Sequence, residues 1–207
     1  MATVSSAVEI APFAPPGFPP EPALRLTVAK YHEMSESGVI REEDRLELLD
    51  GWLFPQVIMR PLHAETVDRV GELLRSLTLP GWRVRVQLPV TLALSEPQPD
   101  ATIVCGLPGA FRERHPSAQD IGLVVEVADS SLVRDRGLKK RLYAEAGIPV
   151  YWIVNLNDRR LEVFSEPTGP AAEPDYRRAE SLDAAGEVPL VLDGHEVARL
   201  SVGPFFV

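Results

Sequence analysis

The stretch Leu123-Val124-Val125-Glu126-Val127 is the most informative part of this sequence, because it is an apolar run interrupted by one carboxylate. Residues 121–128 are almost entirely apolar, which is typical of a strand buried on both faces at the centre of a sheet. Burying an unpaired carboxylate is costly, and a metal ion or a lysine offsets that cost. The residues alone leave two interpretations of Glu126 open, a functional site and a structural ion pair.

Two other side chains complete a series with this carboxylate. Asp100 follows Pro99 and opens the apolar run Ala101-Thr102-Ile103-Val104, and Lys139 lies further on in a basic helical stretch. Two acids and a lysine at one end of a sheet suit metal-dependent phosphodiester cleavage, because the acids hold a hard cation and the lysine supplies positive charge near the attacking water. We therefore expect Asp100, Glu126 and Lys139 to converge. Alternatively, Asp100 caps a turn after Pro99.

Apolar periodicity and turn signals predict the surrounding elements. Helices are predicted from Thr27 to about Ser37, from Pro61 through an apolar stripe that reaches Leu77, and over residues 134–146. Strands are predicted over residues 45–49, 52–54, 82–88, 99–105, 121–128, 150–154 and 159–164, with short ones near Leu190 and Val197. The order predicts an α/β (α+β) fold with a mixed central sheet flanked by helices, to which an N-terminal helix and a β-hairpin are added.

Composition limits the class of protein. The chain has 207 residues, of which 45% are hydrophobic and 25% charged, enough for one well-buried domain. We expect a flexible Pro/Ala-rich arm over residues 1–22 and a single domain over residues 23–207. The only cysteine, Cys105, excludes an internal disulfide, and its apolar strand predicts a buried, inert thiol. A reducing cytoplasm fits this usage, and neither a secretory signal nor a membrane-spanning run is expected.

The charge of the chain is acidic, with a formal net charge of −9 and a pI near 5.0. This counts against indiscriminate nucleic-acid binding, which relies on basic surface. It does not exclude a nuclease, because a carboxylate metal site is acidic by construction. A local basic patch is available in Arg134, Arg136, Lys139, Lys140 and Arg141, although a solvated helix face explains these residues equally well.

This ordered set of segments resembles the PD-(D/E)XK nucleases, which have the restriction-endonuclease-like fold, and more closely the Uma-type endonuclease family. The resemblance covers roughly residues 27–165 and is carried by residues 45–51, His63, residues 86–90, 98–100, 125–127, 135–139 and 143–152. In the parent fold the lysine usually stands two residues after the acid on the same strand, where this chain has Ala128. The Uma-type pattern instead places a lysine on the following helix, at Lys139.

The resemblance implies roles for particular side chains. Mg²⁺ or Mn²⁺ would be held by Asp100, Glu126 and the backbone carbonyl of Val127, Lys139 would orient the attacking water or help to deprotonate it, and Glu47 would add a catalytic or water-mediated contact. Supporting or phosphate-binding roles would fall to His63, Gln87, Asp135 and Arg136. Each has a simpler alternative: a hairpin polar face for Glu47, a surface or packed position for His63, a solvent-facing position for Gln87, and a helix-terminal or ion-pair role for Asp135.

Three functions remain open at this stage. The first is a metal-dependent DNA endonuclease that acts as a cytoplasmic homodimer, since two related sites most simply cut both strands of a duplex. The second is a catalytically silent nucleic-acid-binding or assembly module that keeps the fold. The third is a metal-dependent hydrolase of RNA or a nucleotide. The apolar end Val202-Gly203-Pro204-Phe205-Phe206-Val207 is a candidate dimer interface, or alternatively part of the core.

Overall fold

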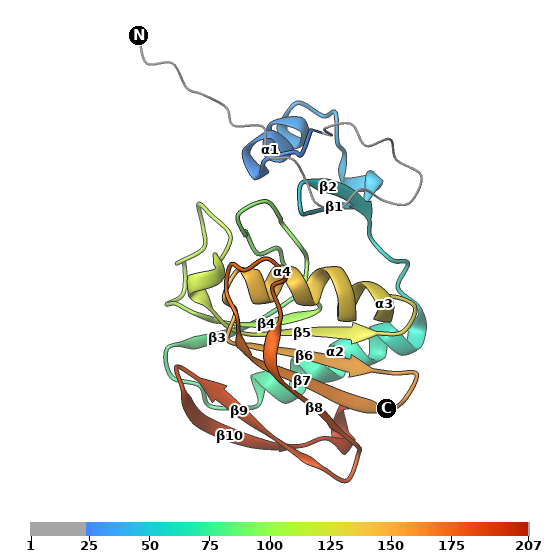
Figure 1. Ribbon diagram of the computed structural model, residues 1–207, viewed down its shortest axis with the longest axis vertical. Coiled ribbons are helices and arrows are strands. Elements are labelled where there is room, and N and C mark those ends of the chain that lie inside the picture. The colour runs from blue at the N-terminus through green and yellow to red at the C-terminus, as the bar shows by residue number, and fades with distance from the viewer. Residues whose placement is uncertain (1–23, 207) are drawn as a thin grey trace.

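The computed structural model describes residues 24–206, so the predicted arm at residues 1–22 lies outside the described part of the chain. A six-stranded sheet forms the centre of the molecule, in the order β3-β4-β5-β6-β7-β8 (Figure 1). Its strands are β3 (Trp82–Val86), β4 (Ala101–Cys105), β5 (Ile121–Ala128), β6 (Val150–Asn155), β7 (Arg160–Pro167) and β8 (Tyr176–Leu182). Only β5 and β6 pair in parallel, and both are buried along their whole length. The predicted mixed sheet with a central β5 is confirmed.

Helices cover the two faces of this sheet. Helix α2 (Pro61–Arg75) packs Val67, Val70 and Leu74 onto one face. The other face carries a continuous helical segment made of α3 (Leu132–Arg134), the π-helical turn η3 (Asp135–Lys139) and α4 (Lys140–Glu145). This segment begins two residues before its predicted start at residue 134. Because side chains alternate along β5, Glu126 shares its face with the apolar side chains that pack beneath this helical segment.

The predicted N-terminal additions are present. Helix α1 (Val28–Glu36) begins after Thr27, whose hydroxyl accepts a hydrogen bond from the backbone N–H of Lys30. The hairpin of β1 (Leu46–Leu49) and β2 (Trp52–Pro55) turns at Asp50 and Gly51, which have φ angles of 53° and 78°. These left-handed positions are the reason that the Asp-Gly pair is a hairpin signal. Three short 3₁₀ turns lie at Glu42–Asp44, Ala118–Asp120 and Gly203–Phe205.

The C-terminal region packs on the α2 side of the sheet (Figure 1). Strands β9 (Glu187–Leu192) and β10 (His195–Ser201) form a hairpin, and Val202, Phe205 and Phe206 then join the same core as α2. Trp152 meets Phe205 edge to face. Of the two interpretations of this apolar end, the structure supports the core for Val202, Phe205 and Phe206.

Cys105 lies in a different environment from the one predicted. Its side chain is exposed, because it is the last residue of β4, where the chain leaves the sheet. The prediction of a buried, inert thiol at this position was wrong. Among the helices of residues 24–206, none combines the length and apolar character needed to cross a membrane.

Candidate active site

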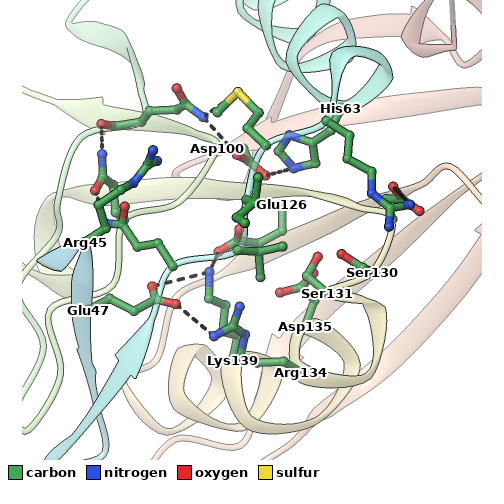
Figure 2. Close-up of a pocket in the computed structure, with 18 residues that line it drawn as sticks. Arg45, Glu47, His63, Asp100, Glu126, Ser130, Ser131, Arg134, Asp135 and Lys139 are labelled. Atoms are coloured by element: carbon green, nitrogen blue, oxygen red, sulfur yellow. Dashed lines mark hydrogen bonds and ion pairs between the residues drawn. The ribbon is translucent and has the colours of Figure 1, made fainter. Parts of the chain in front are cut away.

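Strand pairing brings the two predicted acids together. Antiparallel β4 and β5 pair Ala101 with Val125, so Asp100, one residue before β4, stands beside Glu126. Both line one pocket of about 110 Å³ at this end of the sheet (Figure 2). Its wall includes, among other residues, Arg45, Glu47, Gln56, Arg60, His63, Gln87, Gln98, Asp100, Glu126, Ser130, Ser131, Arg134, Asp135 and Lys139.

Glu126 is buried and held by two donors from the helical segment above it. Its Oε1 accepts a hydrogen bond from Lys139 Nζ at 2.9 Å and another from the hydroxyl of Tyr143 at 2.7 Å. Tyr143 is itself fully buried and packs edge-on against Tyr151. The carboxylate that the apolar strand left unexplained is therefore paired with a lysine.

Glu47 connects the N-terminal hairpin to the same group. Its Oε2 lies 3.7 Å from Lys139 Nζ, and its Oε1 lies 3.5 Å from a guanidinium nitrogen of Arg134. All three side chains converge from different elements, β1, α3 and the π-helical turn (Figure 2). The added hairpin thus contributes directly to the pocket.

Asp100 is held mainly by backbone. Its Oδ2 accepts a hydrogen bond from the backbone N–H of Val127 at 2.8 Å and lies 3.4 Å from His63 Nε2. The side-chain amide of Gln87 donates to Oδ1 at a longer 3.4 Å. Gln87 has a φ of 50°, which turns the chain just after β3, and its side chain faces the pocket. Asp100 therefore stands in a polar setting on the sheet side of the pocket.

Asp135 differs from the other acids of the pocket. Its side chain is 1% exposed, and neither carboxylate oxygen has a hydrogen-bond partner among the described residues. Ser131 lies beside it (Figure 2) and lowers its pKa, without reaching hydrogen-bonding geometry. The pKa of Asp135 is nevertheless raised, because burial outweighs the opposing charge of Lys139.

The electrostatics follow from four buried carboxylates that face one buried lysine. Burial raises the pKa of Glu126 to about 8, with Asp135 and Asp100 adding to the rise and Lys139 opposing it. Burial alone would lower the pKa of Lys139, but Glu126, Glu47 and Asp135 together raise it above its ordinary value. Burial also lowers the pKa of His63, but contact with Asp100 is the main opposing effect, and the pKa of His63 is raised overall. Lys139 therefore stays protonated, while the raised pKa values of Glu126 and Asp135 favour the protonated forms of these two acids.

This donor set fits a hard cation chemically. Oxygen ligands suit Mg²⁺ and Mn²⁺, and the buried oxygens of Asp135 lack any partner. A bound cation would oppose the effect of burial, which is the main cause of the raised pKa of Glu126 and Asp135, and would favour their ionised forms. Within residues 24–206, however, no three histidine, cysteine, aspartate or glutamate side chains already surround one metal position. Cation binding would therefore require side chains to turn.

The structure brings most of the predicted residues to this pocket. Its wall includes Glu47, His63, Gln87, Asp100, Glu126, Asp135 and Lys139. Arg136 is elsewhere: its guanidinium makes two hydrogen bonds to Glu162 on β7, at 2.9 and 2.6 Å, and it does not line the pocket. The expected supporting role of Arg136 has no geometric basis here, because the helix turns this side chain toward β7.

Sequence reasoning missed other contributors. Tyr143 was not singled out as a site residue, yet its hydroxyl donates a hydrogen bond to Glu126. Arg45 was not singled out as a site residue; the structure gives it a left-handed φ of 47° just before β1, which no local sequence signal indicated. A ladder of amides also borders the pocket, with Gln56 donating to Gln98 at 2.7 Å and Gln98 donating to the Gln87 carbonyl at 2.6 Å.

Comparison with known proteins agrees with this architecture. The chain is similar to a solved structure from Anabaena variabilis ATCC 29413, described as "a putative nuclease belonging to DUF820". The TM-score is 0.66 with 15% identity, and the match covers 87% of this chain and 97% of that one. At this identity the likeness establishes the fold. No curated protein matches the chain. A family model described as "Uma2: Putative restriction endonuclease" matches residues 28–201, and the chain therefore belongs to the Uma2 family.

Proposed function

We propose that this protein is a metal-dependent endonuclease that hydrolyses phosphodiester bonds of DNA, with Mg²⁺ or Mn²⁺ as its cation. The observation that carries the proposal is the 2.9 Å contact between Lys139 Nζ and Glu126 Oε1, in a pocket that Asp100 also lines. Two acids and a lysine converge there although the lysine is absent from its usual position, occupied by Ala128. Membership of the Uma2 family supports the same reaction class.

Asp100 and Glu126 are the side chains that would hold the cation. A divalent cation bound there would lower the pKa of a water molecule and stabilise negative charge on the scissile phosphate. Asp100 is already oriented for such a role by the backbone N–H of Val127, at the end of β5. Glu126 would have to exchange contacts with Lys139 and Tyr143 for the cation, and lose the proton that its raised pKa favours.

Lys139 would act as a positive charge and hydrogen-bond donor. Its raised pKa leaves it without a free lone pair near neutral pH, so it would orient a water or phosphate oxygen and would not accept a proton. Of the two roles expected for Lys139, orientation is therefore favoured over deprotonation. Glu47, 3.7 Å from Lys139 Nζ, would keep the ammonium at the pocket when Glu126 turns to the cation.

DNA is the proposed substrate. Arg45, Arg60 and Arg134 line the same pocket and supply local positive charge to phosphates, in spite of the net charge of −9. His63, with its raised pKa, adds a further donor beside Asp100. The same contacts would suit RNA or a nucleotide, so the assay below includes these substrates. A reducing cytoplasm, proposed from the single cysteine, would give access to DNA.

We also propose a homodimer, because two sites related by twofold symmetry would cut both strands of a duplex. Because Val202, Phe205 and Phe206 are buried in the protein's own core, the proposed dimer does not use these three side chains as its interface.

A second candidate is a catalytically silent nucleic-acid-binding or assembly module. It is favoured by the engaged state of Glu126, whose Oε1 already accepts from Lys139 and Tyr143. The lack of three preassembled ligand side chains within the described residues points the same way. In this interpretation the lysine–glutamate pair is structural, and no cation enters.

One experiment separates these functions. Supercoiled plasmid, linear duplex, single-stranded DNA, RNA and nucleotides are incubated with wild-type protein and Mn²⁺, Mg²⁺ or EDTA. Glu126→Gln removes the carboxylate charge at the pocket, and Glu187→Gln makes the same change at an exposed position on β9. We expect cleavage of DNA by the wild type and by Glu187→Gln, with loss of cleavage in Glu126→Gln and in EDTA. Metal-independent cleavage, or equal cleavage by both variants, would refute the proposal, and nucleic-acid binding without any cleavage would favour the silent module.

A further inference from the structure

Asp135 is a buried acid without a partner. Its side chain is 1% exposed, and both carboxylate oxygens lack hydrogen bonds to any described residue. The basic side chains of the same helical segment form their ion pairs elsewhere: Arg134 with Glu47, Arg136 with Glu162, and Lys139 with Glu126 and Glu47. An ionised carboxylate in such a place needs a compensating positive charge. Among the described residues, no basic side chain lies within ion-pairing distance of Asp135.

The backbone holds this acid in place. Asp135 opens the π-helical turn Asp135–Lys139, and its carbonyl accepts the backbone N–H of Lys140 and the hydroxyl of Tyr151. This turn carries two buried side chains, Asp135 and Lys139, and both line the pocket. π-Helical turns of this kind occur frequently at functional sites. Figure 2 shows Asp135 beside Ser131, on the helical side of the pocket that both residues line.

We propose that Asp135 is a third carboxylate ligand of the cation, contributed by the helix in addition to Asp100 and Glu126 from the sheet. This inference rests on the proposed metal-dependent function. Hard divalent cations take several oxygen ligands, and both buried oxygens of Asp135 have no existing hydrogen bond to give up. Glu126, in contrast, must release Lys139 and Tyr143 before it can bind.

The test measures metal binding and folding, and does not depend on cleavage. Mn²⁺ is titrated calorimetrically into full-length wild type, Asp135→Asn and a matched control, Asp68→Asn, which changes an exposed aspartate on α2. Melting temperatures are recorded with and without Mn²⁺. Asp135→Asn should weaken Mn²⁺ binding by roughly tenfold or more, as expected for loss of a ligand. Its melting temperature without metal should equal or exceed that of the wild type, because an unpartnered buried charge has been removed.

The outcomes distinguish this inference from the function on which it rests. No Mn²⁺ binding by the wild type would refute the metal-dependent function itself. Binding by the wild type with a smaller loss in Asp135→Asn would overturn the role of Asp135 alone. Asp135→Ser, which also lacks the carboxylate, is measured in parallel. Failure of both variants to fold would likewise overturn the inference, since the carboxylate would then stabilise the fold without a cation.

Discussion

Replacing Lys139 by alanine, with Lys140→Ala as its control, tests whether the buried lysine takes part in the reaction. Lys139 is 6% exposed and its Nζ contacts Glu126 Oε1 at 2.9 Å. Lys140 is the next residue, yet its Nζ pairs with Asp175 at 2.8 Å and lies over the ring of Phe164, outside the pocket. The same change at adjacent positions therefore removes the pocket ammonium in one variant and an outer ammonium in the other.

The expected effect on cleavage follows from the position of each charge. Removing one preorganised donor that stabilises developing negative charge slows a reaction by about 10²–10³-fold, or roughly 3–4 kcal/mol of barrier. We expect a loss of that size for Lys139→Ala. The Lys140 pair is partly solvated and contributes at most about 1 kcal/mol to stability. Lys140→Ala should therefore cleave at a rate close to that of the wild type.

Stability should change as well, and the assay must allow for it. Breaking a buried ion pair costs about 3–5 kcal/mol. The low end of that range applies here, because burial raises the pKa of Glu126 to about 8, so that removal of Lys139 does not leave an unpaired buried charge near neutral pH. A loss of about 3 kcal/mol lowers the melting temperature of a domain of this size by roughly 6–12 °C. Cleavage is therefore compared well below the melting temperature of Lys139→Ala.

Single-turnover cleavage with saturating enzyme and Mn²⁺ isolates the chemical step from binding. Calorimetry should show that Lys139→Ala binds Mn²⁺ at least as tightly as the wild type, since the ammonium that competes for Glu126 is gone. A single-turnover rate near that of the wild type would refute a chemical role for Lys139. Equal slowing in Lys140→Ala would refute the assignment of that role to the pocket.

Three other predictions follow from the same geometry. Mn²⁺ affinity should fall by about tenfold for each pH unit below about 8, because Glu126 must lose its proton to bind metal. Calorimetry from pH 6 to 9 measures this dependence, and an affinity that does not change with pH would contradict it. Tyr143→Phe should lower the free energy of unfolding by about 1 kcal/mol and slow cleavage, because it removes the 2.7 Å hydrogen bond to Glu126 while the ring keeps its packing against Tyr151. Urea unfolding measures the first effect and single-turnover cleavage the second. An unchanged cleavage rate would limit Tyr143 to a structural role. Light scattering should show a dimer that persists when Phe206 is replaced by Ala in a folded variant, whereas a monomer at high protein concentration would contradict the proposed assembly.

The sheet and its two acids were accessible from sequence, for a physical reason. An apolar run such as residues 121–128 has few alternatives to a central strand, and a single carboxylate within it needs a partner. The position of Asp100 directly after Pro99, at the start of the apolar run Ala101-Thr102-Ile103-Val104, indicated the second acid. The register that sets Ala101 opposite Val125 then follows from strand pairing, which no local pattern specifies.

The helical segment was less accessible, because its inward face depends on backbone geometry. An α-helical pattern over residues 134–146 does not reveal a π-helical turn, which alters the rotation of every residue around it. Arg136 was therefore expected near phosphate, and its guanidinium instead meets Glu162 on β7. Tyr143 stands at an apolar position of this helical segment, but an apolar pattern says nothing about what the hydroxyl of a tyrosine reaches.

The displaced lysine can be explained by packing. Ala128, where the usual pattern has lysine, is fully buried in the apolar layer that also contains Tyr143 and Tyr151. A lysine at this position would have to place its ammonium within that layer. Lys139 reaches Glu126 from the π-helical turn that packs on this face of the sheet, so its ammonium does not have to lie within the apolar layer. The position of the ammonium then depends on how the helix packs over β5 and β6, and less on the strand itself. Substitutions that disturb this packing should therefore alter the lysine–glutamate contact even when both residues are retained.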